Sequence, residues 1–247
     1  MDQVLYQQYA PHAVLSPYID AYWTVTGNNT VAVPDKILPD GCVDIILNPG
    51  PAFTSDTIPL LQDQVYLVGT MTRYKQITRP PDTRLVGIRF KPGGFSFFYD
   101  PSFLKDIADK TVEFDKKLAP LIHEGTQDQD LPLLLNRFFA ERLSNPSQPV
   151  LPFLESISRL NGSVTVSELA RYNFVSIRRL ERLFRLHLGV SPKEFINFVR
   201  YHSALEKIRS RSGRESLLHI ALEYGYYDHA HLSNEIKKYT GSSPSGI

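Results

Sequence analysis

Residues 167–200 read SELARYNFVSIRRLERLFRLHLGVSPKEFINFVR, and residues 220–244 read IALEYGYYDHAHLSNEIKKYTGSSP, a shorter version of the same pattern. The strings GVSP and GSSP lie 52 positions apart, and Leu180 is followed by Leu232 at the same offset. One helical unit is therefore written twice. A duplicated helix-turn-helix offers two rods for two successive major grooves, so the pattern favours sequence-specific DNA binding.

Capping signals place the helices of the first copy. Thr165 with Glu168 forms a capping box, and Ser176 can cap the next helix, because their side-chain oxygens accept bonds from free backbone N–H groups. Two short helices are therefore predicted, over 165–172 and 176–188.

A long helix and a second short pair follow. Gly189 is suited to end the second helix, and Pro192 to open a connector that runs to about residue 209. The short pair is then repeated over 216–224 and 228–239. We predict an all-α domain of seven helices, in which one long helix joins two similar pairs.

The helix over 176–188 has an apolar face and an arginine-rich face. Its predicted inward residues are Ile177, Leu180, Leu183, Phe184 and Leu188. Guanidinium groups pair bidentately with guanine and with phosphate, so the opposite face suits DNA. An isolated basic helix is more often a solvated surface, but the capped helix before it and the second copy favour DNA binding. The expected DNA contacts are Arg178, Arg179, Glu181, Arg182 and Arg185 in the first copy, and His229, Ala230, His231, Asn234, Lys237 and Lys238 in the second.

Residues 163–247 resemble the DNA-binding domain of AraC/XylS-family bacterial transcription regulators, on the two stretches quoted above. The resemblance implies two recognition helices in adjacent major-groove segments of promoter DNA, with RNA polymerase as a protein partner. Three positions depart from the family pattern. Asn234 stands where arginine is usual, and Ile236 and Tyr226 each stand where phenylalanine is usual. The first change weakens the case for the second half-site contact, and the other two are expected only to repack the core.

The first half of the chain is β-rich up to about residue 112. Turn-forming Gly, Pro, Asn and Asp residues separate short apolar runs, which predict strands over 21–26, 43–47, 65–68 and 85–90. From about Pro101 the pattern becomes helical, and an amphipathic stripe consists of Leu131, Leu134, Leu135, Phe138 and Phe139. This stripe either packs on its own domain or forms a homodimer interface. The sequence NPSQP at 145–149 predicts a linker, which gives a domain over 1–145 and another over 146–247.

The stretches ILPDGCVDIIL at 37–47, VGT at 68–70 and VGIRFKPGGFSFF at 86–98 are similar to an uncharacterised domain that often precedes this DNA-binding domain. The resemblance implies a cupin-like β-barrel sensor, so the whole chain is expected to be an α+β protein of two domains. Asp40, Asp44, Arg89 and Lys91 are candidate contacts for a small-molecule effector. Such residues more often hold turns and strand ends, and that alternative stays open.

Composition and charge narrow the function further. The net charge is −4 up to Asn145 and +5 beyond it, so the basic excess lies in the half with the repeat. No apolar run of 18 residues and no signal-peptide pattern occurs, which predicts a cytoplasmic protein without a membrane partner.

A catalytic barrel with a vestigial DNA-binding tail is the alternative function. Metal-dependent barrels of this kind need about three histidines and a carboxylate around one ion. The first 145 residues contain only His12 and His123, and the single cysteine, Cys42, has no histidine near it in sequence. We therefore expect no enzyme activity, no metal and no cofactor.

Overall fold

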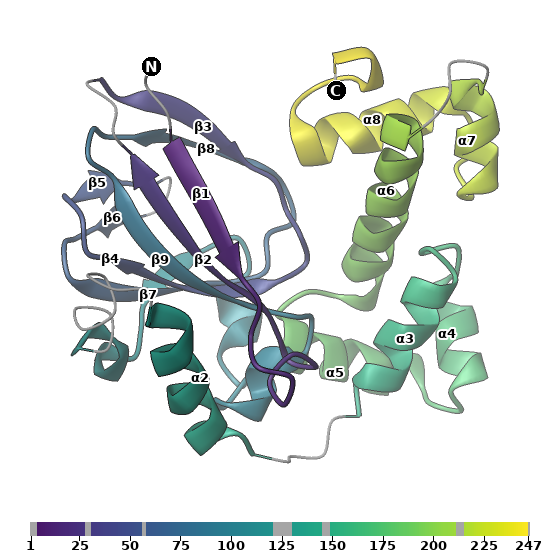
Figure 1. Ribbon diagram of the computed structural model, residues 1–247. Helices are drawn as coiled ribbons and strands as arrows, with labels where there is room; N and C mark the ends of the chain where they lie inside the picture. Colours follow the sequence, from purple (N-terminus) through teal and green to yellow (C-terminus); the bar gives the residue numbers. More distant parts are fainter. Residues whose placement is uncertain are drawn as a thin grey trace.

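The computed structural model describes residues 4–27, 31–55, 58–120, 130–144, 149–210 and 215–246. A β-rich N-terminal part lies beside an all-helical C-terminal part, in which helix α6 stands upright between α3–α5 and α7–α8 (Figure 1). This arrangement confirms the predicted α+β class. The proposed linker at 145–149 falls largely outside the described residues, so the domain boundary stays a prediction.

The N-terminal part is built on one antiparallel sheet of six strands in the order β1-β2-β9-β4-β7-β10. Their bounds are β1 Val4–Tyr9, β2 Ile19–Gly27, β4 Val43–Asn48, β7 Gln64–Val68, β9 Arg84–Phe90 and β10 Thr111–Glu113. Two small sheets accompany it, one of β3 (Val33–Ile37) with β8 (Lys75–Arg79) and one of β5 (Phe53–Thr54) with β6 (Pro59–Leu60). The predicted strands correspond to β2, β4, β7 and β9, and the other six were not predicted.

Both faces of the large sheet are covered, because successive side chains of a strand point to opposite sides. Ile45 and Leu47 of β4 belong to the core that also contains the short 3-10 helices η1 (Gly94–Phe97) and η2 (Leu104–Asp106). Ile46, between them, packs with Trp23 and Leu85 on the other side, under β5 and β6. Strand β10 occupies part of the region expected to be helical, where it extends the sheet by pairing with β7.

Helix α2 (Leu131–Arg142) carries the amphipathic stripe and packs on its own domain. Leu131, Leu135, Phe138 and Phe139 are buried in the core of the large sheet, and Leu134 is half-buried. Phe139 contacts Phe90 of β9 edge to face, with ring centroids 5.6 Å apart. Of the two predicted roles for the stripe, the structure supports packing within the domain.

In the described ranges of the C-terminal part there are six α-helices and a terminal 3-10 helix. The helices are α3 (Leu151–Arg159), α4 (Val166–Tyr172), α5 (Ile177–Leu188), α6 (Pro192–Ser210), α7 (Leu217–Glu223), α8 (His229–Thr240) and η4 (Pro244–Gly246). All the predicted caps are present. They include the Thr165–Glu168 box before α4 and the serine cap Ser176 before α5, and Ser216 caps α7 in the same way.

Helix α6 serves two separate apolar cores. Its N-terminal half packs with α3, α4 and α5 through Phe195 and Ile196. Its C-terminal half packs with α7 and α8 through Tyr201, Ala204 and Leu205. Each helix-turn-helix, α4–α5 and α7–α8, is therefore built around its own end of α6.

One residue that was predicted to face the core is exposed instead. Ile177 is 48% exposed, whereas Leu180, Leu183, Phe184 and Leu188 are buried as predicted. Ile177 belongs to the first turn of α5, which extends past the core before the helix meets α4 and α6. Helical periodicity places Ile177 on the inward face but cannot show where that face begins to be covered.

The turn between α4 and α5 contains a strained residue. Phe174 has φ of 54°, in the left-handed region, and is 97% exposed. The corresponding residue in the turn between α7 and α8 is Gly225, with φ of 74°. Left-handed backbone costs residues with a Cβ on the order of 1 kcal/mol, and Phe174 gains no burial in return.

Phe174→Gly is therefore expected to raise the free energy of unfolding by about 0.5–1 kcal/mol, measured by urea denaturation. Tyr227→Gly is the control, since Tyr227 is 86% exposed in the other turn but is not among the residues with positive φ. A gain of the same size in the control would show that backbone strain at Phe174 is not the cause.

Candidate nucleic-acid interface and cavity

The outer face of α5 is basic and accessible. Arg178, Arg179, Arg182 and Arg185 are exposed, and Glu181 is half-buried. Ser176 accepts a bond from the Arg179 backbone N–H at 3.2 Å and fixes the start of the helix. Within the described ranges, no acidic side chain forms an ion pair with these four arginines. Their guanidinium groups are therefore available to an anionic partner.

The outer face of α8 is the equivalent surface in the second unit and is less charged. The predicted residues His229, Ala230, His231, Asn234, Lys237 and Lys238 are all exposed. Asp228 caps the helix by accepting a bond from the His231 backbone N–H at 2.7 Å. The structure thus brings both predicted sets onto the outer faces of repeat-equivalent helices.

A polar network links α8 to α6 and to the turn before α8. The Tyr226 hydroxyl donates to Glu235 at 2.9 Å, and Arg200 of α6 pairs with the same carboxylate at 3.6 Å. The Arg200 guanidinium also lies 4.6 Å from the centre of the Tyr226 ring. Tyr226 was expected only to repack the core. It is buried there, and its hydroxyl additionally ties the turn to α6 and α8.

A cavity of about 420 Å³ lies between the large sheet, the β3–β8 sheet and α6. Apolar side chains dominate its lining on the sheet side, among them Trp23, Ile46 and Leu85. Tyr201, His202, Leu205 and Arg209 of α6 complete it, so the helical part supplies one wall.

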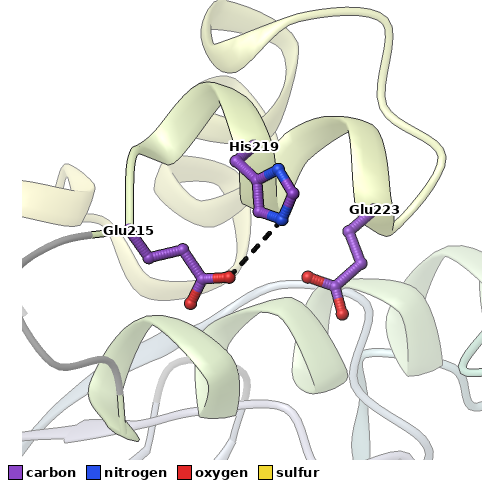
Figure 2. A group of neighbouring side chains, drawn as sticks. All are labelled: Glu215, His219 and Glu223. Carbon is purple, nitrogen blue, oxygen red and sulfur yellow. Dashed lines mark ion pairs between the residues drawn. The ribbon is translucent and has the colours of Figure 1, made fainter.

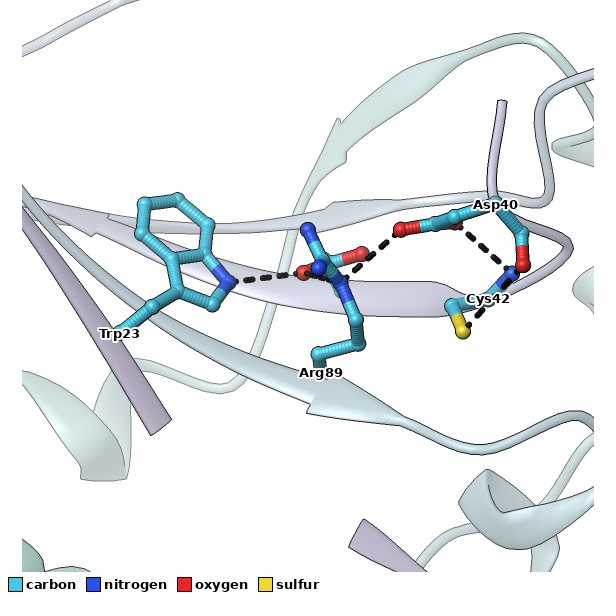
Figure 3. Close-up of polar contacts among 5 residues, drawn as sticks. Trp23, Asp40, Cys42 and Arg89 are labelled. Atoms are coloured by element: carbon cyan, nitrogen blue, oxygen red, sulfur yellow. Dashed lines mark hydrogen bonds and ion pairs between the residues drawn. The ribbon is translucent and has the colours of Figure 1, made fainter. Parts of the chain in front are cut away.

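Three of the four predicted effector residues meet at this cavity (Figure 3). Arg89 Nε lies 2.9 Å from Asp40 Oδ2 and 3.4 Å from Asp44 Oδ1, and the Trp23 indole N–H donates to Asp44 Oδ1 at 2.9 Å. Strand pairing explains the meeting, because Asp44 on β4 is opposite Arg89 on β9. The fourth, Lys91, is exposed beyond the end of β9 and is not among the lining residues.

Two carboxylates share one guanidinium here, and one of them, Asp44, has a raised pKa. Burial, followed by the charge of Asp40, raises the pKa of Asp44 to about 7, although Arg89 and Trp23 oppose the shift. Burial and the charges of Asp40 and Asp44 also raise the pKa of the Cys42 thiol well above its usual value. Cys42 is thus kept protonated, and its thiol lies 3.6 Å from the Asp40 carbonyl oxygen.

Sequence reasoning missed the charged residues on the opposite wall. Lys75 and Arg79 of β8 line the cavity, and Arg79 pairs with Asp35 of β3 at 2.6 Å. Proline and charged residues in VPDKI and KQITR hide the period-two pattern of these strands. A faint signal exists in the apolar Val33, Ile37 and Ile77, but it does not indicate which strand pairs with which.

A cluster of potential ligand atoms occurs on α7. Among the described residues, atoms of Glu215, His219 and Glu223 all lie within 4.8 Å of one another (Figure 2). Lys207 forms an ion pair with Glu215 at 3.3 Å, and His219 faces the same carboxylate at 3.6 Å. The acidic charge of Glu215 is therefore already balanced by Lys207.

Protonation of Asp44 is expected to change the fluorescence of Trp23, the one tryptophan in the chain, with a midpoint near pH 7. The pKa of Asp44 is higher in the folded chain than in the unfolded chain, so ionisation of Asp44 favours unfolding. The wild type should accordingly gain stability relative to Asp44→Asn as the pH falls from about 7 to about 4, by up to ~1.4 kcal/mol per unit. Urea denaturation across this range measures the difference.

Asp44→Asn is also the control for the fluorescence titration, because it retains His202, the titratable residue on the α6 wall. Identical fluorescence titrations of the two proteins would contradict the assignment to Asp44.

Comparison with known proteins agrees with both halves of the fold. A helix-turn-helix domain family matches residues 169–247, and a domain of unknown function (DUF6597) matches residues 7–113. An uncharacterised HTH-type transcriptional regulator of Haemophilus influenzae is 36% identical over 80 residues, which cover 32% of this chain and 26% of the relative. The HTH-type transcriptional regulator ArgR of Pseudomonas aeruginosa is 30% identical over 125 residues, covering 50% and 35%. The chain thus spans about a quarter to a third of these curated relatives.

Solved structures are similar at lower levels. An AraC-type transcriptional regulator of Chromobacterium violaceum has 25% identity and a TM-score of 0.35, covering 40% of this chain and 92% of its own. ToxT of Vibrio cholerae with bound unsaturated fatty acid has 13% identity and a TM-score of 0.46, covering 89% and 95%. Within the described part of the chain, every helix is too short or too polar to span a lipid bilayer. The chain thus contains a match to a helix-turn-helix domain family over residues 169–247 and a match to the DUF6597 family over residues 7–113.

Proposed function

We propose that the chain is a sequence-specific transcription regulator that places α5 and α8 in adjacent major-groove segments of a promoter. The carrying observation is the accessible basic face of α5, repeated as a polar face on α8 at an offset of 52 residues. Two equivalent helices joined by one connecting helix can enter two successive segments of the major groove.

The two helices contribute differently to this proposal. On α5, Arg178, Arg182 and Arg185 can pair with guanine edges or with phosphates, so α5 supplies most of the affinity. On α8, Ala230 can contact a thymine methyl group, and Asn234 can pair bidentately with adenine. Lys237 and Lys238 follow in the last turns of α8 and suit phosphate contacts.

The N-terminal domain is proposed to bind a small-molecule effector in the cavity. A volume of about 420 Å³ with mainly apolar walls and a few converging polar groups is typical of such sites. Asp40, Asp44 and Arg89 would orient the effector, while Lys91 lies outside the cavity. Because α6 forms one wall, an effector would directly contact the helix that joins the two reading units. Screening small molecules for a change in Trp23 fluorescence tests this proposal, and Ile46→Phe, which reduces the cavity volume without adding a second tryptophan, should weaken binding.

Binding, not catalysis, is the proposed role. The described cavity lining takes its one histidine, His202, from α6, and His12 lies outside it, where its imidazole Nδ1 accepts from the Val14 N–H at 3.4 Å. His123 lies outside the described residues. This lining provides no set of three histidines for a barrel metal, so no catalytic alternative is favoured.

Partners and location follow from the proposed function. Promoter DNA is the main partner, and RNA polymerase is the protein partner by which a bound regulator would act. The relatives are bacterial, so the proposed place of action is the cytoplasm. A homodimer would need a surface other than the stripe of α2, which its own core covers. Sedimentation of the full chain with and without DNA decides the oligomeric state.

Selection of genomic promoter fragments by the purified chain at moderate salt tests the proposed function. Enrichment of fragments that share a two-part motif would support it. Equal retention of promoter fragments and random DNA would overturn it.

Arg182→Ala is expected to weaken binding to the selected site by about 1–3 kcal/mol and to relax preference at one base position, the range for a bidentate base contact. Lys238→Ala should weaken binding to all sequences alike and reduce the salt slope by about one unit, as loss of a phosphate contact does. Fluorescence anisotropy against matched and mismatched duplexes measures both effects. If both variants lose affinity equally for all DNA sequences, Arg182 contacts a phosphate and not a base edge.

A further inference from the structure

The N-terminal domain contacts the two recognition helices at equivalent atoms. Leu188 ends α5 and Thr240 ends α8, and the two residues are 52 positions apart. The Thr70 hydroxyl donates to the Leu188 carbonyl at 2.6 Å, and the Lys36 ammonium donates to the Thr240 carbonyl at 2.9 Å. Both carbonyl groups lie beyond the last helical hydrogen bonds, so the N-terminal domain supplies donors that the helices lack.

The glycines that follow these carbonyls are also contacted in the same way. Gly189 and Gly241 both have left-handed φ, of 77° and 71°. A Cβ on Gly189 would lie 2.6 Å from the carbonyl oxygen of Leu104, and one on Gly241 would lie 2.6 Å from the Tyr74 ring. Each recognition helix therefore ends in the same motif, pressed against the N-terminal domain.

Within the helical part, the two units are joined through α6. The α4–α5 and α7–α8 units have separate cores and share α6 alone. A third contact from the N-terminal domain meets α6 between these cores, where Gly41 lies directly against the Phe198 ring. The N-terminal domain thus contacts the end of α5, the ring of Phe198 on α6 and the end of α8.

We propose that the N-terminal domain is a clamp that sets the separation and orientation of α5 and α8, and that Thr70 and Lys36 are positioning residues for half-site spacing. The inference rests on the proposed function and extends it from which bases are read to how far apart the two half-sites must lie. Neither residue touches DNA, and each acts through the helix end that it holds.

The cavity lies between the two contacts of the clamp, Lys36 with the end of α8 and Thr70 with the end of α5. Lys36 belongs to β3, whose residues Asp35 and Ile37 line the cavity, while Thr70 is adjacent to the lining residue Met71 near the other wall. Thr70 is held in place by its carbonyl, which accepts from the Asp109 N–H at 3.1 Å. A molecule in the cavity that displaces β3 therefore moves the contact to α8 and leaves the contact to α5 in place.

The test selects DNA with the full-length chain from a library in which the two half-sites are separated by spacers of varied length. Lys36→Met and Thr70→Val remove the two donors, and Lys36→Arg and Thr70→Ser restore them. Lys110→Met and Thr83→Val are matched controls, because Lys110 and Thr83 donate to the carbonyls of Asp106 and Pro80 inside the N-terminal domain.

The wild type is expected to enrich one spacing. Lys36→Met and Thr70→Val should lower its enrichment over spacings one base pair longer or shorter by about two- to tenfold, as loss of one net hydrogen bond implies. The bases selected within each half-site should not change. The restoring variants and the controls should behave as the wild type does.

An unchanged spacing preference in both Lys36→Met and Thr70→Val overturns the clamp, and so does an equal loss of binding at every spacing. These results differ from failure of the proposed function itself, in which the wild type would enrich no sequence. Lys36 is on the surface, so Lys36→Met keeps the test decisive if Thr70→Val fails to fold.

Discussion

The ends of α5 and α8 are buried, and a buried helix end must find donors for its last carbonyl groups. Leu188 and Thr240 are 1% and 3% exposed, so water does not provide these donors. Side chains of the N-terminal domain provide them instead, from Thr70 and Lys36. The position of the sheet relative to the helices depends on this requirement, and the cavity exists because the two parts are held together in this way. An isolated helical domain would expose both carbonyl groups to solvent and lose the wall that α6 gives to the cavity.

The cavity combines apolar walls with a cluster of ionised groups, which is costly unless the charges are paired. Arg89 satisfies this condition for Asp40 and Asp44 only in part, since one cation faces two carboxylates. Burial, followed by the charge of Asp40, therefore still raises the pKa of Asp44. Trp23 stabilises the pair with its indole N–H and lies directly over Gly87, where any Cβ would overlap the ring. A charged molecule that enters the cavity would therefore change the protonation of Asp44 and its pairing with Arg89. This would occur in the same cavity to which α6 contributes a wall.

Local patterns predicted the helical half well, because its signals lie within a few residues of the structures they determine. Ser176, Gly189 and Thr165 act on adjacent backbone groups, and the caps formed as expected. The contacts between the halves could not be predicted in this way. Thr70 and Leu188 are 118 residues apart, Lys36 and Thr240 are 204 apart, and threonine and lysine have many ordinary roles. The structure brings Asp40, Asp44 and Arg89 together, whereas Lys91 lies apart from them beyond the end of β9, a boundary that the predicted strand over 85–90 already marked.

Phe198 has an effect on folding that reaches beyond the cores it touches. Its ring packs against both helical cores and lies on Gly41 of the N-terminal domain, so three separately packed bodies share one side chain. Regions with separate cores usually open independently, with their own free energies of local unfolding. A shared ring couples them, because opening any one body removes part of the packing of the other two. The chain should therefore melt as a single cooperative unit despite its separate cores, with heat absorption in one transition.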